Sequence, residues 1–250
     1  MASVSSTAGG GTSPRSVIPD KDFDEEYRRK GAYHRNPAGF TRVFLRRNYA
    51  LLRRFVGERA TILHLGCGEG EFGARVADGQ RVVGLDRSAT ALRFAHRSGR
   101  RHYVQGAIPL LPFRAACFDA VVSSLTLQYV PPAEWDVLLE EVRRVLINGG
   151  LFCFSYINAA HVSVRDRLSG SPAQAGRTVA IHSTESLFAV LSRHGWRVRR
   201  FVGTNLRVPY DALPSLLRGP AWAIAVLLGH PFPRLSYHFV VLAEPDARRR

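Results

Sequence analysis

The stretch TILHLGCGEGEF at residues 61–72 decides the fold of this chain, because an apolar strand pattern runs directly into closely spaced glycines. Glycine lets the backbone approach a ligand where any Cβ would collide. The segment after the glycines predicts a helix whose first N–H groups face a polar or anionic group. About twenty residues further on, RVVGLD at residues 81–86 is a second apolar strand that ends in a carboxylate, Asp86. The two stretches together predict a nucleoside-bearing ligand across the ends of two parallel strands.

The rest of the chain alternates strand-like and helix-like segments. Further strands are predicted at residues 101–105, 118–123, 151–156, 196–202 and 237–243, and amphipathic helices at 40–56, 133–146 and 184–194. This alternation predicts an α/β fold with a Rossmann-like, mostly parallel sheet and helices on both of its faces. In such sheets ligands bind beyond the carboxyl ends of the strands, which is where the glycines and Asp86 fall.

The composition favours one soluble domain with an unusual charge. The chain has 250 residues, of which 46% are hydrophobic and 22% charged, and these values are ordinary for a globular protein. The net charge of +15 is not ordinary, and nearly all of the basic residues are arginines. Residues 1–20 are rich in Ser, Gly and Thr, so we expect a disordered tail before a single domain at residues 21–250.

The cysteines and the hydropathy of the sequence indicate where in the cell the protein is expected. Cys67, Cys117 and Cys153 show no CxxC spacing, so we expect reduced thiols, a cytoplasmic protein and no metal site. The longest apolar run, residues 221–229, is shorter than the roughly 20 residues that span a bilayer. The sequence therefore predicts no transmembrane segment.

The glycine loop distinguishes between two kinds of nucleotide cofactor. A dinucleotide fingerprint has the spacing G-x-G-x-x-G, and here Glu71 stands where the third glycine belongs. Glu69 and Glu71 would also repel a pyrophosphate. They would tolerate a phosphate-free cofactor whose reactive end is cationic, and S-adenosylmethionine is such a cofactor.

Five short motifs in order make the chain resemble the class I S-adenosylmethionine-dependent methyltransferases, in the type 11 group that includes quinone and carrier-protein methyltransferases. They are LHLGCG at 63–68, VGLD at 83–86, LPF at 111–113, FDAVVSS at 118–124 and RRVLINGG at 143–150. The resemblance covers roughly residues 61–156 and implies a seven-stranded sheet whose last strand is antiparallel. It also implies an N-terminal helical cap at residues 21–57 and an insert over the acceptor pocket at residues 204–235.

The resemblance also implies a set of cofactor-binding residues. Asp86 would hold the ribose hydroxyls, Gly66 and Gly68 would shape the turn over the methionine half, and Ser123 would lie near the transferable methyl group. The full expected set is Tyr33, His64, Gly66, Cys67, Gly68, Asp86, Arg87, Gly106, Ala107, Ile108 and Ser123.

Two positions depart from the family pattern. His64 stands where the family usually has an acid, and Ala107 stands where it usually has an Asp that caps the adenine amino group. The hydrogen bond lost at Ala107 is worth about 1 kcal/mol, which a backbone carbonyl could replace.

Methyl transfer mainly requires that the acceptor be aligned behind the methyl group and that water be excluded. A phenol or carboxylic acceptor can need a general base, for which histidine is suited near pH 7. His161 and His182 are the candidates, because the family's segment after the fifth strand reaches over the acceptor pocket. The alternative is that His182 packs in the turn before Ser183 and that His161 is a solvated loop residue. Gln128 and Tyr129 are candidate acceptor-pocket residues or, alternatively, core residues.

Three partners would explain the positive charge: nucleic acid, an anionic membrane surface, or an acidic carrier protein. Arginines spread along the chain and the lack of an RNA-binding module disfavour nucleic acid. The apolar residues between Leu216 and Leu227 favour a membrane surface or a lid over the acceptor. We expect methyl transfer to an oxygen or carbon of a hydrophobic small molecule, lipid or carrier-bound substrate, by a cytoplasmic protein that is free or peripheral at a membrane.

Two other functions remain open from the sequence, and the oligomeric state is not indicated. One is a non-catalytic binding or assembly protein that kept a degenerate methyltransferase fold after losing acids at two cofactor positions. The other is an RNA methyltransferase.

Overall fold

The structure is a computed structural model and describes residues 23–31, 39–75, 79–97, 102–158, 182–206, 213–229 and 231–246. The side chains of the first turn of the helix that begins at Gly39 are not among them.

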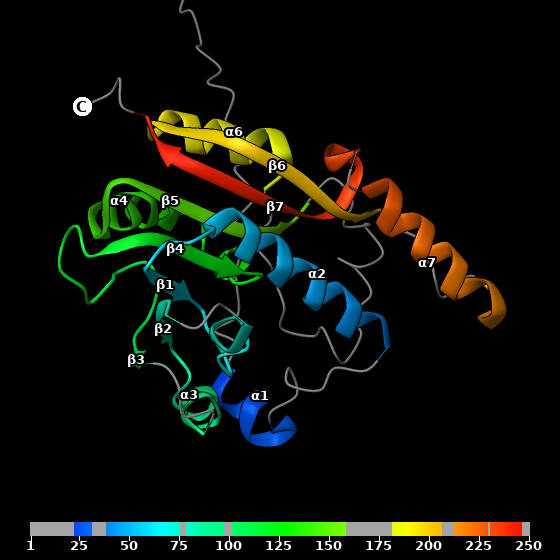
Figure 1. Cartoon of the computed structure of the whole chain (residues 1–250), viewed down its shortest axis with the longest axis horizontal. Helices are drawn as coiled ribbons and strands as arrows, with labels where there is room; N and C mark the ends of the chain where they lie inside the picture. The colour runs from blue at the N-terminus through cyan, green and yellow to red at the C-terminus, as the bar shows by residue number, and fades with distance from the viewer. Residues whose placement is uncertain are drawn as a thin grey trace, which may run out of the picture.

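Seven strands form one sheet in the order β3-β2-β1-β4-β5-β7-β6 (Figure 1). The strands are β1 (Thr61–Leu65), β2 (Arg81–Asp86), β3 (His102–Gln105), β4 (Phe118–Ser124), β5 (Leu146–Ile157), β6 (Trp196–Leu206) and β7 (Ser236–Pro245). The pairs among β1 to β5 are parallel, whereas β7 runs antiparallel to both β5 and β6. The expected Rossmann-like sheet with an antiparallel last strand is therefore confirmed.

Helices cover the two faces of this sheet because successive strand residues point to opposite sides. The helices are α1 (Phe23–Lys30), α2 (Gly39–Val56), α3 (Ala89–His96), α4 (Trp135–Val145), α6 (Thr184–Arg193) and α7 (Ser215–Gly229). Val121 of β4 belongs to the buried cluster that contains the apolar stripes of α4 and α6. Its neighbours Ala120 and Val122 belong to the cluster that contains Leu52 of α2.

Three predicted helices are confirmed nearly to the residue. The helix predicted at residues 184–194 is α6, and its N-cap Ser183 accepts a hydrogen bond from the Ser186 N–H as a Ser cap does. The helices predicted at 133–146 and 40–56 are α4 and α2. The glycines at 149 and 150 follow the start of β5, which begins at Leu146, earlier than the predicted strand at 151–156.

The helix expected directly after the glycine loop is not found in the described residues. A single 3₁₀ turn, Gly73–Arg75, follows instead. The loop itself has the backbone that glycines allow, with φ of +63° at Gly66 and +52° at Gly68. A Cβ at Gly66 would also lie 2.2 Å from Cγ2 of Thr126, so this position excludes any side chain.

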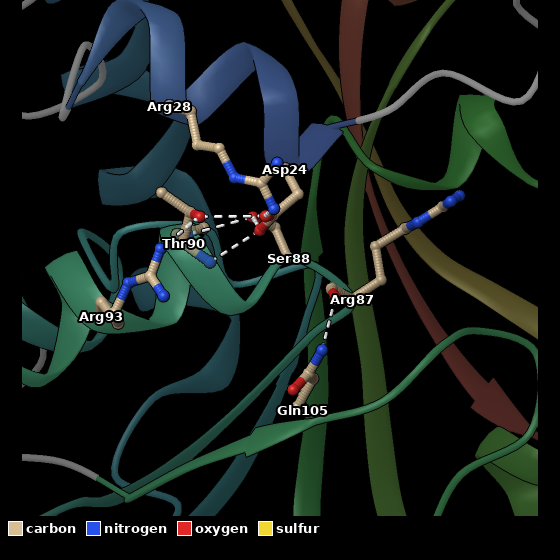
Figure 2. A network of polar contacts seen from close by, with 8 residues as sticks. Asp24, Arg28, Arg87, Ser88, Thr90, Arg93 and Gln105 are labelled. Carbon is tan, nitrogen blue, oxygen red and sulfur yellow. Dashed lines mark hydrogen bonds and ion pairs between the residues drawn. The ribbon is translucent and has the colours of Figure 1, made fainter.

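The N-terminal helix α1 is held to the start of α3 by Asp24 (Figure 2). Asp24 Oδ1 accepts hydrogen bonds from the Thr90 N–H at 2.7 Å and from Ser88 Oγ at 2.8 Å. Its Oδ2 accepts from Thr90 Oγ1 at 3.0 Å and from the Arg28 guanidinium at 2.6 Å. The hydrogen bond from the Thr90 backbone is the largest cause that lowers the pKa of Asp24 to about 2. A carboxylate from one helix thus helps to cap another.

We predict that Asp24→Asn destabilises the fold by about 1–2 kcal/mol near neutral pH, because it removes charge-assisted hydrogen bonds to the α3 N-terminus. A carboxyl whose folded pKa is lowered stabilises the fold above its unfolded value and loses that contribution as pH falls to its folded value. For Asp24 the window runs from about pH 4 to about pH 2. Urea unfolding measures the free energy of unfolding of both proteins at pH 7 and at pH 3. The difference in this free energy between variant and wild type should be smaller at pH 3.

The matched control for that experiment is Glu58→Gln. Glu58 is exposed, and no ion pair or side-chain hydrogen bond joins it to another described residue. An equal loss of stability in both variants would contradict the role given to Asp24.

Candidate functional site

A cavity of about 690 Å³ lies at the carboxyl ends of β1, β2 and β4. Nine of the expected cofactor-binding residues line it: His64, Gly66, Cys67, Gly68, Asp86, Arg87, Gly106, Ala107 and Ile108. His64 and Asp86 lie at the carboxyl ends of β1 and β2, and the other seven come from the loops after β1, β2 and β3, which the parallel sheet brings to one edge. Gln128 and Tyr129, which follow β4, line the same cavity.

The remaining expected residues are placed differently. Ser123 is fully buried and its hydroxyl donates to the Leu65 carbonyl at 3.2 Å, whereas its neighbour Ser124 lines the cavity. His182 is not among the residues that line the cavity; its ring packs on Trp135 with 5.1 Å between ring centres. Its Nδ1 lies 3.3 Å from Ser186 Oγ, at the α6 cap. Tyr33 and His161 lie outside the described residues.

Asp86 is held in place by the backbone on both sides of it. Its Oδ2 accepts from the Gly68 N–H at 2.7 Å, and its Oδ1 accepts from the Ser88 N–H at 2.9 Å. Burial raises the pKa of Asp86, and these two hydrogen bonds act in the opposite direction. Because a carboxylate oxygen has more than one acceptor site, Asp86 can still accept hydrogen bonds from two adjacent hydroxyl groups of a ligand bound in the cavity.

His64 presents a buried polar atom to the cavity wall. Its side chain is 2% exposed, and burial lowers its pKa to about 3, so the imidazole is neutral at physiological pH. Its Nε2 has no hydrogen-bond partner among the described residues, and the same holds for Oε1 of Gln128. Buried polar atoms without partners are costly. Both side chains belong to the cavity wall, but these two atoms have almost no exposed surface, so a ligand would pair with them after a small side-chain movement.

Acidic side chains give this part of the cavity a negative character. Glu69 is buried in the wall and Glu71 lies beside it, where it forms an ion pair with Arg75. Burial, and next the Glu71 charge, raise the pKa of the nearby Tyr49 to about 12. Such a wall suits a cationic group and disfavours a pyrophosphate.

Helix α1 lies within the expected N-terminal cap, and four of its residues that were not predicted as site residues form a further wall of the cavity. Phe23, Glu26, Tyr27 and Lys30 all line the cavity. The Phe23 ring lies 5.1 Å from the Tyr129 ring, edge to face, and the Arg87 guanidinium lies 5.7 Å from the Phe23 ring centre. The alternation of aromatic and charged residues at 23–30 was the available signal, because one face of this short helix is buried.

A hydrogen-bonded cluster shapes the cavity beyond the end of β4. The Asn48 side-chain amide donates to Ser124 Oγ at 2.7 Å and to Ser155 Oγ at 3.1 Å. Ser155 Oγ also accepts from the N–H of Leu125, a residue with a φ of +51°. This cluster holds Leu125 in the left-handed region, where a branched residue is uncommon, and Leu125 lines the cavity.

The central segment of the chain matches a known protein family, and longer parts of it resemble individual proteins. Residues 63–154 match the family described as "Methyltransferase domain". A malonyl-[acyl-carrier protein] O-methyltransferase of Erwinia pyrifoliae is 30% identical over 164 residues, which are 65% of this chain and 61% of that protein. A fatty-acid O-methyltransferase of Mycolicibacterium smegmatis is 34% identical over 104 residues, which are 39% of this chain and 37% of that protein. The chain thus spans less than two thirds of the length of these relatives.

Solved structures share the fold at low identity. A protein of Pyrococcus horikoshii superposes with a TM-score of 0.65 at 19% identity, over 90% of this chain and 100% of that one. An S-adenosylmethionine dependent methyltransferase of Mesorhizobium loti superposes with a TM-score of 0.57 at 21% identity, over 78% of this chain and 95% of that one. These likenesses support the architecture described above.

We predict that His64→Phe weakens S-adenosylmethionine binding about ten-fold, because phenylalanine fills similar space but offers no hydrogen bond. Isothermal titration calorimetry measures the affinity. The control is His238→Phe, because His238 is a partly buried histidine whose pKa is also lowered by burial to about 3 but which does not line the cavity. Unchanged affinity in His64→Phe would show that Nε2 does not contact the cofactor.

Proposed function

We propose that this chain is a class I S-adenosylmethionine-dependent methyltransferase of the type 11 group that transfers a methyl group to an acyl or other hydrophobic acceptor; the match of residues 63–154 to a methyltransferase domain supports this. The observation that carries the proposal is the Asp86 carboxylate in a cavity wall that also contains Glu69 and Glu71. A carboxylate suits a ribose diol, and the neighbouring acids suit a sulfonium cofactor without phosphate.

The residues present fit the cofactor. Asp86 would hold the ribose hydroxyls, with the aromatic face of Phe23 and the Arg87 side chain nearby. The unpartnered Nε2 of neutral His64 would accept a hydrogen bond from the methionine ammonium, in place of the usual acid. The backbone of residues 106–108 would face the adenine ring. The Ala107 side chain has no atom that could accept a hydrogen bond from the adenine amino group.

S-adenosylmethionine supplies an electrophilic methyl group on a sulfonium when it is bound. The chain's own part is to align the acceptor and to keep water away. The α1 residues cover the cavity from one side, and the cluster around Asn48 fixes the wall at Ser124 and Leu125 on the other. Because α1 is tied to α3 through Asp24, this cover is part of the folded structure.

Two facts support a carboxylate oxygen as the acceptor atom. The relatives named above are O-methyltransferases of a carrier-bound malonyl group and of fatty acids. His64 is the sole histidine among the described residues of the cavity wall, and with a pKa of about 3 it does not act as a base near pH 7. A carboxylate is already ionised at that pH and needs no base. We therefore infer an acyl carboxylate, free or carrier-bound, as the substrate class.

The direct test is transfer of an isotopically labelled methyl group from S-adenosylmethionine to a panel of acceptors. The panel contains long-chain fatty acids, a malonyl-loaded carrier protein, a phenolic lipid precursor and total RNA. The proposal expects label on a carboxyl group, as an ester that mild base releases. Label on RNA would overturn it, and so would calorimetry that detects no cofactor binding.

We predict that Asp86→Asn weakens S-adenosylmethionine binding roughly ten- to hundred-fold, because a neutral amide makes weaker hydrogen bonds to the ribose. Calorimetry measures the change, and thermal unfolding checks that the variant folds. The matched control is Asp119→Asn, because Asp119 also accepts a backbone hydrogen bond, from the Thr61 N–H at 2.7 Å, but lies outside the cavity wall. Equal affinities for the two variants would contradict the role of Asp86.

A further inference from the structure

The outward face of α7 consists entirely of apolar residues. The exposed residues of this helix after its first position are Leu216, Leu217, Gly219, Pro220, Ala223, Ile224, Leu227 and Leu228. Leu216 is 84% exposed and Leu227 is 69% exposed. Phe232 and Leu235, which follow the helix, are also more than half exposed. An exposed apolar surface of this extent marks an interaction site.

The opposite face of α7 packs against the end of β6, and this packing fixes the orientation of the helix. Ala225 and Gly229 are buried, and a Cβ on Gly229 would lie 2.7 Å from the Asn205 backbone in β6. Ser236 Oγ donates to the Gly229 carbonyl at 2.9 Å and ties the end of the helix to the start of β7. The one arginine of the helix, Arg218, turns back to donate to the Leu213 carbonyl at 3.0 Å. Arg218 is partly exposed near the start of the helix, and the leucines face outward.

The described residues of α7 are absent from the wall of the cavity. The expectation that residues 204–235 form a lid over the acceptor therefore stays a prediction. The outer face of α7 is an exposed apolar surface for which a separate binding partner is needed. In Figure 1, α7 lies where β6 ends and β7 begins, and it runs outward from the sheet.

Charge around this face favours an anionic partner. From Leu213 to Ser236, the stretch that contains α7, the sequence has two arginines, Arg218 and Arg234, and no acidic residue, and the chain as a whole has a net charge of +15. Arg234 lies exposed between Phe232 and Leu235, beside the apolar face. A second copy of the chain carries the same net charge of +15 and would be repelled.

Hydrogen bonding distinguishes a lipid from a protein partner. Protein interfaces make about one hydrogen bond per 100–200 Å². Apart from Ser215 at its first position, the exposed residues of α7 have no polar side chain with which to make one. Lipid hydrocarbon requires no such bonds, and arginines at the edge of an apolar face suit lipid phosphates. Among the described residues no helix is long and apolar enough to cross a membrane, so α7 would lie along the surface.

We propose that α7 and the following residues Phe232 and Leu235 form a membrane-surface site, with the apolar face in the lipid and the arginines on anionic headgroups. The site goes beyond the proposed methyl transfer and does not depend on it. It would place the protein at the surface where acyl chains are found.

The test is flotation of the purified full chain with vesicles made of equal parts phosphatidylglycerol and phosphatidylcholine, or of phosphatidylcholine alone. The chain should float with the anionic vesicles and be released in part by salt. Leu227→Glu should reduce the partition coefficient about ten-fold or more, because it places a charge where a leucine enters hydrocarbon.

The matched control is Leu110→Glu, which makes the same change at a leucine that is 68% exposed in a loop before β4. It should leave flotation unchanged, and both variants should keep the wild-type affinity for S-adenosylmethionine and the wild-type melting temperature. An equal loss of flotation with anionic vesicles in both variants, or no loss of flotation in Leu227→Glu, would overturn the proposal. Light scattering that shows a dimer broken by Leu227→Glu, without flotation of the wild type, would assign the face to a second copy instead.

Discussion

The hydrogen bonds of Asp86 are the constraint on which the site depends. Asp86 is the last residue of β2. Its two carboxylate oxygens accept hydrogen bonds from the N–H of Gly68, in the loop after β1, and from the N–H of Ser88, at the start of α3. Ser88 Oγ in turn donates to Asp24 on α1. One chain of hydrogen bonds therefore connects the glycine loop, β2, α3 and the helix that covers the cavity. Removing its central carboxylate would loosen both walls of the site at once.

The same cavity carries polar groups that the fold itself does not satisfy. Nε2 of His64 and Oε1 of Gln128 are buried without partners among the described residues. Leu125 has an unfavourable backbone conformation that Ser155 stabilises. Such costs concentrate where a ligand binds, since a ligand that supplies the missing partners turns them into affinity. Buried polar atoms without partners also occur away from the cavity, for example Nε1 of Trp196, so these atoms indicate a cofactor site only together with Asp86 and the glycine loop.

Much of the fold could be predicted because strand and helix periodicities are local, and the strands of a parallel sheet bring their ends to one edge. The site was less predictable. Ser123 and Ser124 are equal candidates in sequence, and only the register of β4 decides that Ser124 faces the cavity. The wall from α1 depends on Asp24 reaching α3, more than sixty residues away in sequence. The apolar run in α7 suggested a lid, and its orientation depends on how Gly229 packs against β6.

The measurement that tests the central claim most directly is a crystal structure of the chain with S-adenosylhomocysteine. The account predicts both ribose hydroxyls within hydrogen-bond distance of Asp86, the ammonium group near His64, and α1 packed over the ligand. A ligand bound elsewhere, or a cavity that accepts a dinucleotide pyrophosphate beside Glu69 and Glu71, would contradict it.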